Sequence, residues 1–197
     1  MSTWAIIPVK ASPESKSRLA GVLDAAQRAA LVEAMLTRVI KAACDARNVA
    51  QVCLLGTPRQ APPSGVALLA EPGGGLNTAV SAALAEAAAR GASRVIFVHG
   101  DLPLVTARDL ELLAAAPLGE IAIAPDRHGT GTNAISLPLP EARGFSFAFG
   151  PDSFAQHNAE AERLGLKIEE IHSPGLARDV DEPEDLPDAA ALLKPAS

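Results

Sequence analysis

The chain has 197 residues, of which 48% are hydrophobic, so it is long and apolar enough for one folded domain and is unlike a disordered chain. Its formal net charge of −6 argues against the basic surface of duplex-binding proteins, so no nucleic acid partner is expected. No apolar run approaches the roughly 20 residues that span a bilayer, and no N-terminal signal pattern is present. We therefore expect a cytoplasmic protein that has no membrane partner.

Strands and helices alternate along most of the chain. The first apolar run, 4–9, is too short for a helix and predicts a buried strand, which Pro8 should end because proline has no N–H to donate. Asp24 with Gln27 resembles a capping box and predicts the start of a helix. Similar patterns predict helices beginning near Leu76, Thr106 and Ser153, and strands at 51–55, 66–69, 94–98, 120–124, 133–137 and 167–171. This alternation predicts an α/β fold with a mostly parallel mixed sheet flanked by helices, in a single domain over 1–197.

Ligands in open α/β sheets bind at the carboxyl ends of strands, and a cationic loop follows the first predicted strand. This loop carries Lys10, Lys16 and Arg18 together with several hydroxyl side chains. Three cations at a strand end can hold a polyphosphate. The alternative is an ordinary solvated polar loop, as most charged runs are.

Three consecutive glycines, Gly73, Gly74 and Gly75, run into the predicted helix that begins near Leu76. They lack the third glycine of a dinucleotide fingerprint, because that place is Thr78, and no GK[ST] of a P-loop follows. The segment is therefore either a turn or a place where the backbone approaches a flat ligand. In the second case, the side-chain amide of Asn77 could bind the same ligand.

A carboxylate, Asp101, directly follows the apolar strand 94–98, at the mouth of the predicted sheet. Mg²⁺ prefers one or two carboxylates plus substrate phosphates, and the tail offers more in Asp179 and Asp181, which point the same way on an extended chain. The alternatives are a turn aspartate and a solvated acidic tail.

The sequence contains no pattern typical of a zinc site or of a covalent nucleophile. The four histidines show no ligand spacing, and Cys44 and Cys53 form no CxxC pair, so they are expected to be reduced thiols. No GxSxG stretch or Cys/His dyad is present.

Together the loops resemble a known family, the 2-phospho-L-lactate guanylyltransferases of deazaflavin coenzyme biosynthesis, which include enzymes that use phosphoenolpyruvate or 3-phosphoglycerate. The resemblance covers nearly the whole chain in family order, through the stretches IIPVKASPESKSRLAGVL, GGGLNTAV, HGDLPL, APDRHGTGTNAI, FAFGPDSFAQHNAEAERLG and RDVDEPEDL. It implies a GT-A-like nucleotidyltransferase fold. It also implies a reaction in which the phosphate of a small phospho-acid attacks the α-phosphorus of GTP and releases pyrophosphate.

The resemblance also implies roles for particular residues. Lys10, Lys16, Arg18 and Asp101 would be catalytic, and Asp101, Asp179 and Asp181 would hold Mg²⁺. The nucleotide would lie against Pro8, Lys10, Gly73, Gly74, Gly75, Leu76 and Asn77. The acceptor acid would lie against Thr132, Asn133, Gly150 and Ser153. The resemblance does not choose among the phospho-acids, and it identifies no interface for a homodimer.

Other functions stay open. A molybdopterin guanylyltransferase or a sugar-acid cytidylyltransferase would share the fold, although such enzymes usually have a glycine-rich first loop, and here no glycine occurs before Gly21. A nucleotide-binding module without catalysis would not need both Asp101 and the Asp179/Asp181 pair.

Overall fold

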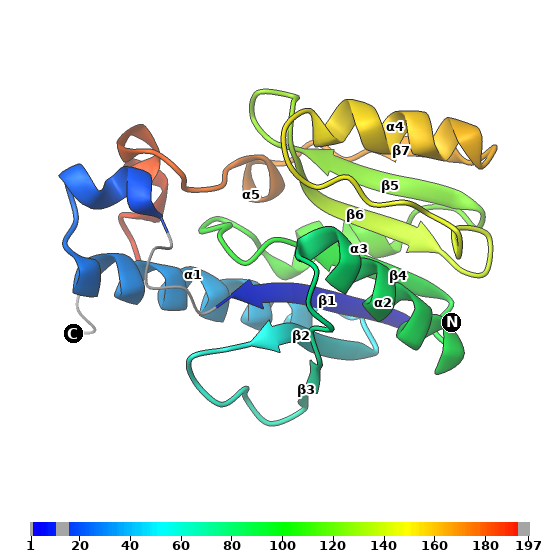
Figure 1. Cartoon of the computed structure of the whole chain (residues 1–197), viewed down its shortest axis with the longest axis horizontal. Coiled ribbons are helices and arrows are strands. Elements are labelled where there is room, and N and C mark those ends of the chain that lie inside the picture. Colours follow the sequence, from blue (N-terminus) through cyan, green and yellow to red (C-terminus); the bar gives the residue numbers. More distant parts are fainter. Residues whose placement is uncertain (1, 11–15, 193–197) are drawn as a thin grey trace.

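The computed structural model describes residues 2–10 and 16–192, with the backbone alone for Lys10. Its strands form one seven-stranded sheet of order β3-β2-β1-β4-β6-β5-β7. All neighbouring strands are parallel except β6, which runs antiparallel to both β4 and β5. The predicted mixed, mostly parallel sheet is confirmed (Figure 1). The strands are β1 (Thr3–Lys10), β2 (Gln51–Thr57), β3 (Val66–Leu69), β4 (Arg94–Val98), β5 (Glu120–Pro125), β6 (Thr132–Pro138) and β7 (Lys167–Glu170).

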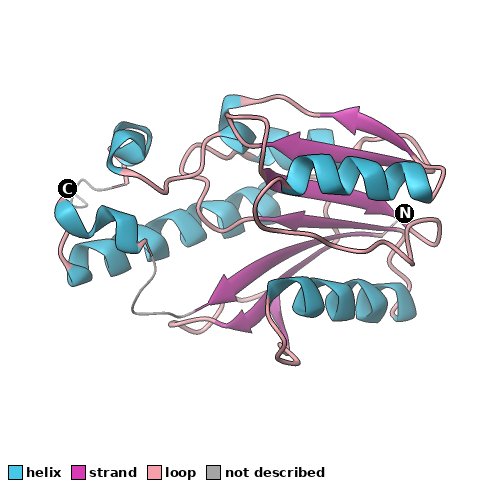
Figure 2. Cartoon of the chain, turned by 45° about the horizontal axis from the view of Figure 1, so that its top comes forward, coloured by secondary structure: helices cyan, strands magenta, loops and turns pink. Residues whose placement is uncertain are grey.

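Helices cover both faces of the sheet and make two cores (Figure 2). On one face, α1 (Ala25–Asp45) and α3 (Ala107–Ala114) bury leucine, valine and alanine side chains against β1 and β4. On the other face, α2 (Leu76–Ala89) and α4 (Ser153–Arg163) pack with three phenylalanines of the 142–149 segment. The predicted capping box of Asp24 and Gln27 begins α1. Every position of β4 is buried, as expected for a strand covered on both faces.

The prediction that Pro8 ends the first strand is wrong. Strand β1 continues to Lys10, and its pairing with β2 runs from Trp4 to Lys10. Its pairing with β4, in contrast, stops at Ile6. Proline is tolerated within a strand where no ladder hydrogen bond is required of it, and the β4 side of Pro8 is such a place.

The carboxyl-terminal segment returns to the start of the chain. A short helix α5 (Pro174–Ala177) leads to the turn 178–182 and then to the 3-10 helix η2 (Pro183–Ala189). Val180 and Ala189 bury with Leu19 of the 3-10 helix η1 (Ser17–Gly21) and with the first turns of α1. Figure 1 shows η1 (blue) and η2 (red) side by side at one end of the molecule. Segments from the two ends of the chain therefore meet beside the sheet. Within the described residues, no helix is both long enough and apolar enough to cross a membrane.

Candidate functional site

A cleft of about 380 Å³ opens at the carboxyl edge of the sheet, where parallel strands β1, β2, β3 and β4 end together. Ligand sites of open α/β sheets lie at this edge. Side chains from α1 and α2 form its walls, and the loops after β1 and β4 supply its charged end. The residues predicted to bind substrates or metal that also line the cleft are Pro8, Lys16, Gly75, Leu76 and Asp101.

Lys16 joins two of the predicted carboxylates at the charged end of the cleft. Its Nζ donates to Asp101 Oδ2 at 2.5 Å and to Asp181 Oδ1 at 2.6 Å. Only 11% of its side chain is exposed, and its backbone is left-handed with φ of 58°, a conformation that side chains other than glycine seldom adopt. Burial opposes the charge of Lys16, but the two carboxylates outweigh it and hold its pKa above the ordinary value. The ammonium group is thus a fixed cation in the cleft.

Asp101 is the carboxylate at the centre of this arrangement. Burial acts to raise its pKa, but Lys16 and His99 outweigh that effect and keep the pKa below its usual value. Its Oδ1 is buried and has no hydrogen-bond partner among the described residues. Because buried polar atoms are normally paired, an ionised oxygen of this kind is a place for a ligand to bind.

Asp179 lies close enough to Asp101 for the two charges to interact. Burial, and next the charge of Asp101, raise the pKa of the Asp179 carboxyl group. Asn133 donates from Nδ2 to Asp179 Oδ1 at 3.2 Å and to the carbonyl of Leu176 at 2.9 Å. Asn133, predicted to contact the acceptor, therefore holds Asp179, and so joins the predicted acceptor residues to the predicted metal ligands.

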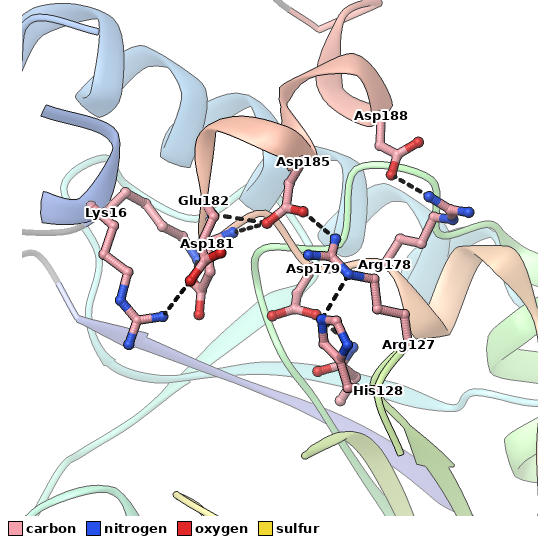
Figure 3. A network of polar contacts seen from close by, with 11 residues as sticks. Lys16, Arg127, His128, Arg178, Asp179, Asp181, Glu182, Asp185 and Asp188 are labelled. Carbon is pink, nitrogen blue, oxygen red and sulfur yellow. Dashed lines mark hydrogen bonds and ion pairs between the residues drawn. The ribbon is translucent and has the colours of Figure 1, made fainter. Parts of the chain in front are cut away.

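The turn that places Asp179 and Asp181 is anchored by Asp185, which the sequence reasoning did not single out. Asp185 is nearly fully buried, and its Oδ2 accepts the backbone N–H groups of Asp181 at 2.9 Å and Glu182 at 2.8 Å. Its Oδ1 pairs with Arg127 of the loop after β5 (Figure 3). Burial acts against its charge, but these donors lower the pKa of Asp185 overall. The sequence signals of this arrangement are the DxxxD spacing and the proline and acidic residues that begin η2.

The three predicted cations do not share one environment. Lys16 lies in the cleft, whereas the side chain of Arg18 is 68% exposed and reaches Glu182 at 3.5 Å. The side chain of Lys10 lies outside the described part of the chain. A cation not predicted, Arg59 of the loop after β2, lines the cleft and faces Glu33 at 4.0 Å. The structure thus brings one predicted cation and one further cation to the cleft.

The glycine-rich loop has the backbone that its sequence requires. Gly73, Gly74 and Gly75 have φ values of 86°, 83° and 88°, which other residues rarely adopt. Gly75 is the N-cap of α2 and lines the cleft with Leu76, while Gly73 and Gly74 are exposed beside it. The loop therefore brings bare backbone to one wall of the cleft, and its contact with a base stays a prediction.

Asn77, which is predicted to contact the nucleotide, bonds to Phe149 through its side chain. Its Oδ1 accepts the backbone N–H of Phe149 at 2.8 Å, and its Nδ2 donates to the carbonyl of Phe149 at 3.2 Å. The side-chain amide is thus engaged in both directions by the segment before Gly150. One N–H and one lone pair of Oδ1 are left for other partners.

Thr132 and Ser153, predicted to contact the acceptor, are buried, and Gly150 is exposed beside them. None of these three residues lines the cleft of about 380 Å³. The Oγ1 of Thr132 lies 3.0 Å from Nδ1 of His157, and the backbone N–H of Ala148 donates to Nε2 of the same ring at 3.0 Å. Nε2 is therefore the acceptor, Nδ1 carries the proton, and the hydroxyl hydrogen of Thr132 is free to donate elsewhere.

His99 also belongs to the cleft, although the sequence reasoning assigned it no role. It lines the cleft two residues before Asp101, and its ring centroid lies 5.2 Å from that of Phe149. Its backbone N–H donates to the carbonyl of Asn133 at 3.0 Å. His99 thus lies between the cleft and the predicted acceptor residues.

Acidification from pH 7 to pH 5 is expected to lower the free energy of unfolding by about 2 kcal/mol through His157. Burial, and next the charge of His99, lower its pKa from 6.5 to about 4, although Glu160 opposes this. The folded state keeps the ring neutral while the unfolded chain takes up a proton below pH 6.5. Stability is therefore complete above pH 6.5 and falls as the pH drops towards 4. Urea unfolding at both pH values should show this loss in the wild type and a smaller one in His157→Gln; equal losses would contradict it.

Comparison with known proteins finds similar sequences over nearly the whole chain. The family model described as "Guanylyl transferase CofC like" matches residues 3–191. A phosphoenolpyruvate guanylyltransferase of Sphaerobacter thermophilus is 41% identical over 195 residues, which cover 96% of this chain and 93% of the relative. One of Conexibacter woesei is 41% identical over 194 residues, covering 94% and 86%.

Several solved structures that resemble the chain carry the names of nucleotidyltransferases. A Methanothermobacter nucleotidyl transferase superposes with a TM-score of 0.66 at 14% identity over 98% of both chains. The 2-C-methyl-D-erythritol 4-phosphate cytidylyltransferase of Thermus thermophilus superposes with a TM-score of 0.58 at 18% identity, also over 98% of both chains. At these identities the likeness shows the fold alone.

Proposed function

The chain belongs to the CofC-like guanylyltransferase family, and we propose that it joins GMP from GTP to the phosphate of phosphoenolpyruvate, with release of pyrophosphate, in deazaflavin coenzyme biosynthesis. It is a nucleotidyltransferase by family, and phosphoenolpyruvate is proposed because similar chains carry that name. The observation that carries the proposal is the Lys16–Asp101–Asp181 arrangement at the end of a cleft lined by bare backbone.

The reaction requires the protein mainly to position the two substrates and to neutralise the charge of their phosphates. A phosphate monoester has a second pKa of about 6, so it is already largely dianionic near neutral pH and needs no general base. One oxygen of this phosphate attacks the α-phosphorus of GTP, a P–O bond forms, and the bond to the leaving pyrophosphate breaks. Lys16, with Lys10 and Arg18 as proposed contacts, would neutralise the triphosphate and the pyrophosphate. Such positioned charges carry most of the catalysis in phosphoryl transfer.

We propose that Asp101, with Asp179 or Asp181, would hold Mg²⁺ together with the substrate phosphates. Asp101 Oδ1 is an ionised oxygen to which no described residue donates a hydrogen bond, Asp181 shares Lys16 with Asp101, and the charge of Asp101 acts on Asp179. Within the described residues, no three His, Cys, Asp or Glu side chains already converge on one metal position, so substrate phosphates would have to complete the site. Mg²⁺ takes one or two carboxylates and completes its shell with substrate phosphates and water, so these oxygens match its needs. When bound, Mg²⁺ would polarise the α-phosphoryl group and neutralise charge on the leaving group.

The nucleotide and the acceptor would enter from different sides of Asp101. The base and ribose would lie along Pro8, Gly75 and Leu76, which line the cleft, and along the exposed backbone of Gly73 and Gly74 beside it. The acceptor acid would lie against Thr132, Gly150 and Ser153, near the start of α4, whose N-terminus favours an anion.

Pyrophosphate release tests the proposal. GTP, ATP and CTP are each combined with phosphoenolpyruvate, 2-phospho-L-lactate, and 2- and 3-phosphoglycerate, with and without Mg²⁺. Release is expected with GTP and phosphoenolpyruvate, and only with Mg²⁺. Release with CTP alone would indicate a sugar-acid type of cytidylyltransferase, and no release with any pair would contradict nucleotidyl transfer to these acids.

A further inference from the structure

The segment 145–149 has no regular secondary structure, and side chains from two helices hold its backbone. The N–H of Ser146 donates to Glu160 Oε1 at 2.7 Å, and the N–H of Ala148 donates to His157 Nε2 at 3.0 Å, both on α4. The N–H and the carbonyl of Phe149 bond to Asn77, at the start of α2. Because backbone groups need partners, this segment takes its shape from those three side chains.

Asn77 is the member of this set that connects the segment to the nucleotide side of the cleft. It follows Gly75 and Leu76, both of which line the cleft, and it binds the residue directly before Gly150. Hydrogen bonds to both the N–H and the carbonyl of Phe149 fix the position and the orientation of the backbone at this residue. Asn77 therefore acts as a clamp between the glycine-rich loop and the predicted acceptor side.

The clamped segment contacts two histidines, each of which bonds to a predicted acceptor residue. The ring of Phe149 lies 4.9 Å from the ring of His157, centroid to centroid, and 5.2 Å from that of His99. His157 in turn orients the hydroxyl of Thr132. The backbone N–H of Ser153 donates to the carbonyl of Gly150 at 3.2 Å. A displacement of Phe149 would therefore shift the groups that surround the acceptor acid.

We propose that Asn77 is a positioning residue for the acceptor phospho-acid, acting through Phe149 and Gly150, rather than a contact to the guanine or ribose. This inference rests on the proposed function for the identity of the acceptor. Two observations argue against a role in base recognition: Asn77 is not among the residues that line the cleft, and its two bonds to Phe149 direct the amide towards that segment. The glycine backbone and Leu76 remain as the nucleotide wall.

The test compares Asn77→Ala with Ser81→Ala. Ser81 lies one turn further along α2, where its hydroxyl donates to the carbonyl of Asn77 at 2.8 Å, so its removal deletes one hydrogen bond and leaves the clamp. Three quantities are measured for each protein: KM for phosphoenolpyruvate, Kd for GTP by calorimetry, and hydrogen exchange of the 145–150 amides. Asn77→Asp is a second variant, which keeps an acceptor for the N–H of Phe149 and removes the donor to its carbonyl.

Asn77→Ala is expected to raise KM for phosphoenolpyruvate at least about 10-fold, to change Kd for GTP less than about 3-fold, and to speed exchange at Phe149. Asn77→Asp should give an intermediate rise in KM, and Ser81→Ala should leave all three quantities unchanged. A loss of GTP affinity as large as the effect on the acceptor would overturn the proposal, as would unchanged exchange at Phe149. Wild-type protein that releases no pyrophosphate would contradict the proposed function instead, while the exchange measurement would still test the clamp.

Discussion

Asp101→Asn is expected to lower kcat for guanylyl transfer by about 1,000-fold while leaving the protein folded, a loss typical of removing one fixed charge from a transition state. The substitution keeps the shape of the side chain and removes the charge of Oδ1, the oxygen that no described residue pairs with. Lys16 retains Asp181 as an ion-pair partner, so its ammonium group stays neutralised in the variant. The loss should therefore fall on the chemical step, which single-turnover measurement of pyrophosphate release separates from substrate binding.

Asp45→Asn is the matched control for Asp101→Asn. Asp45 makes a similarly short ion pair, 2.6 Å from Lys41, but both side chains are more than half exposed at the end of α1. This variant should keep wild-type activity. If Asp101→Asn retained more than about a third of the wild-type kcat, a metal-binding or charge-fixing role for Asp101 would be contradicted.

The second large effect is expected for Lys16→Met. Loss of this buried ammonium group should reduce kcat/KM for GTP by about 100- to 1,000-fold, since it removes a charge placed against the phosphates. It also leaves Asp101 and Asp181 facing each other without their cation, so metal or nucleotide binding has to overcome their repulsion. The effect should therefore appear both in Kd for GTP and in the rate of the chemical step.

Lys41→Met is the control for Lys16→Met, because it breaks the exposed pair with Asp45 and should have little effect, as exposed ion pairs contribute under about 1 kcal/mol. Activity of Lys16→Met at or above the wild-type level would contradict the proposed role of this cation. Lys16 would then only neutralise the carboxylates and would occupy a place that a metal ion fills during the reaction.

Local sequence patterns predicted most of the fold. The apolar run 94–98 forms a strand that is buried at every position, because helices cover both faces of the sheet. The capping pair Asp24 and Gln27 begins a helix, as predicted. Chain order could not give the direction of β6, which depends on how the 126–131 turn reverses the chain between β5 and β6. Pro8 was misread because its tolerance depends on where the pairing with β4 stops, a property of two distant strands.

Part of the site could be predicted from the order of the strands along the chain. Lys16 and Asp101 follow strands, and strand ends meet at one edge of a parallel sheet, so their proximity follows from the order of elements. The contacts of Asn77 with Phe149, and of Asp185 with Arg127, join segments 72 and 58 residues apart through side-chain geometry. No local pattern encodes such pairs, and for that reason the sequence alone could not predict that Asn77 bonds to Phe149.

The most direct test is to identify the product by phosphorus NMR. Wild-type protein is incubated with GTP, phosphoenolpyruvate and Mg²⁺, and the phosphorus signals are followed with time. We expect pyrophosphate and a new diphosphate, which links GMP to the phosphate of phosphoenolpyruvate, to accumulate in equal amounts. GTP that is only hydrolysed, or a phosphoenolpyruvate signal that stays unchanged while GTP is consumed, would contradict guanylyl transfer to this acid.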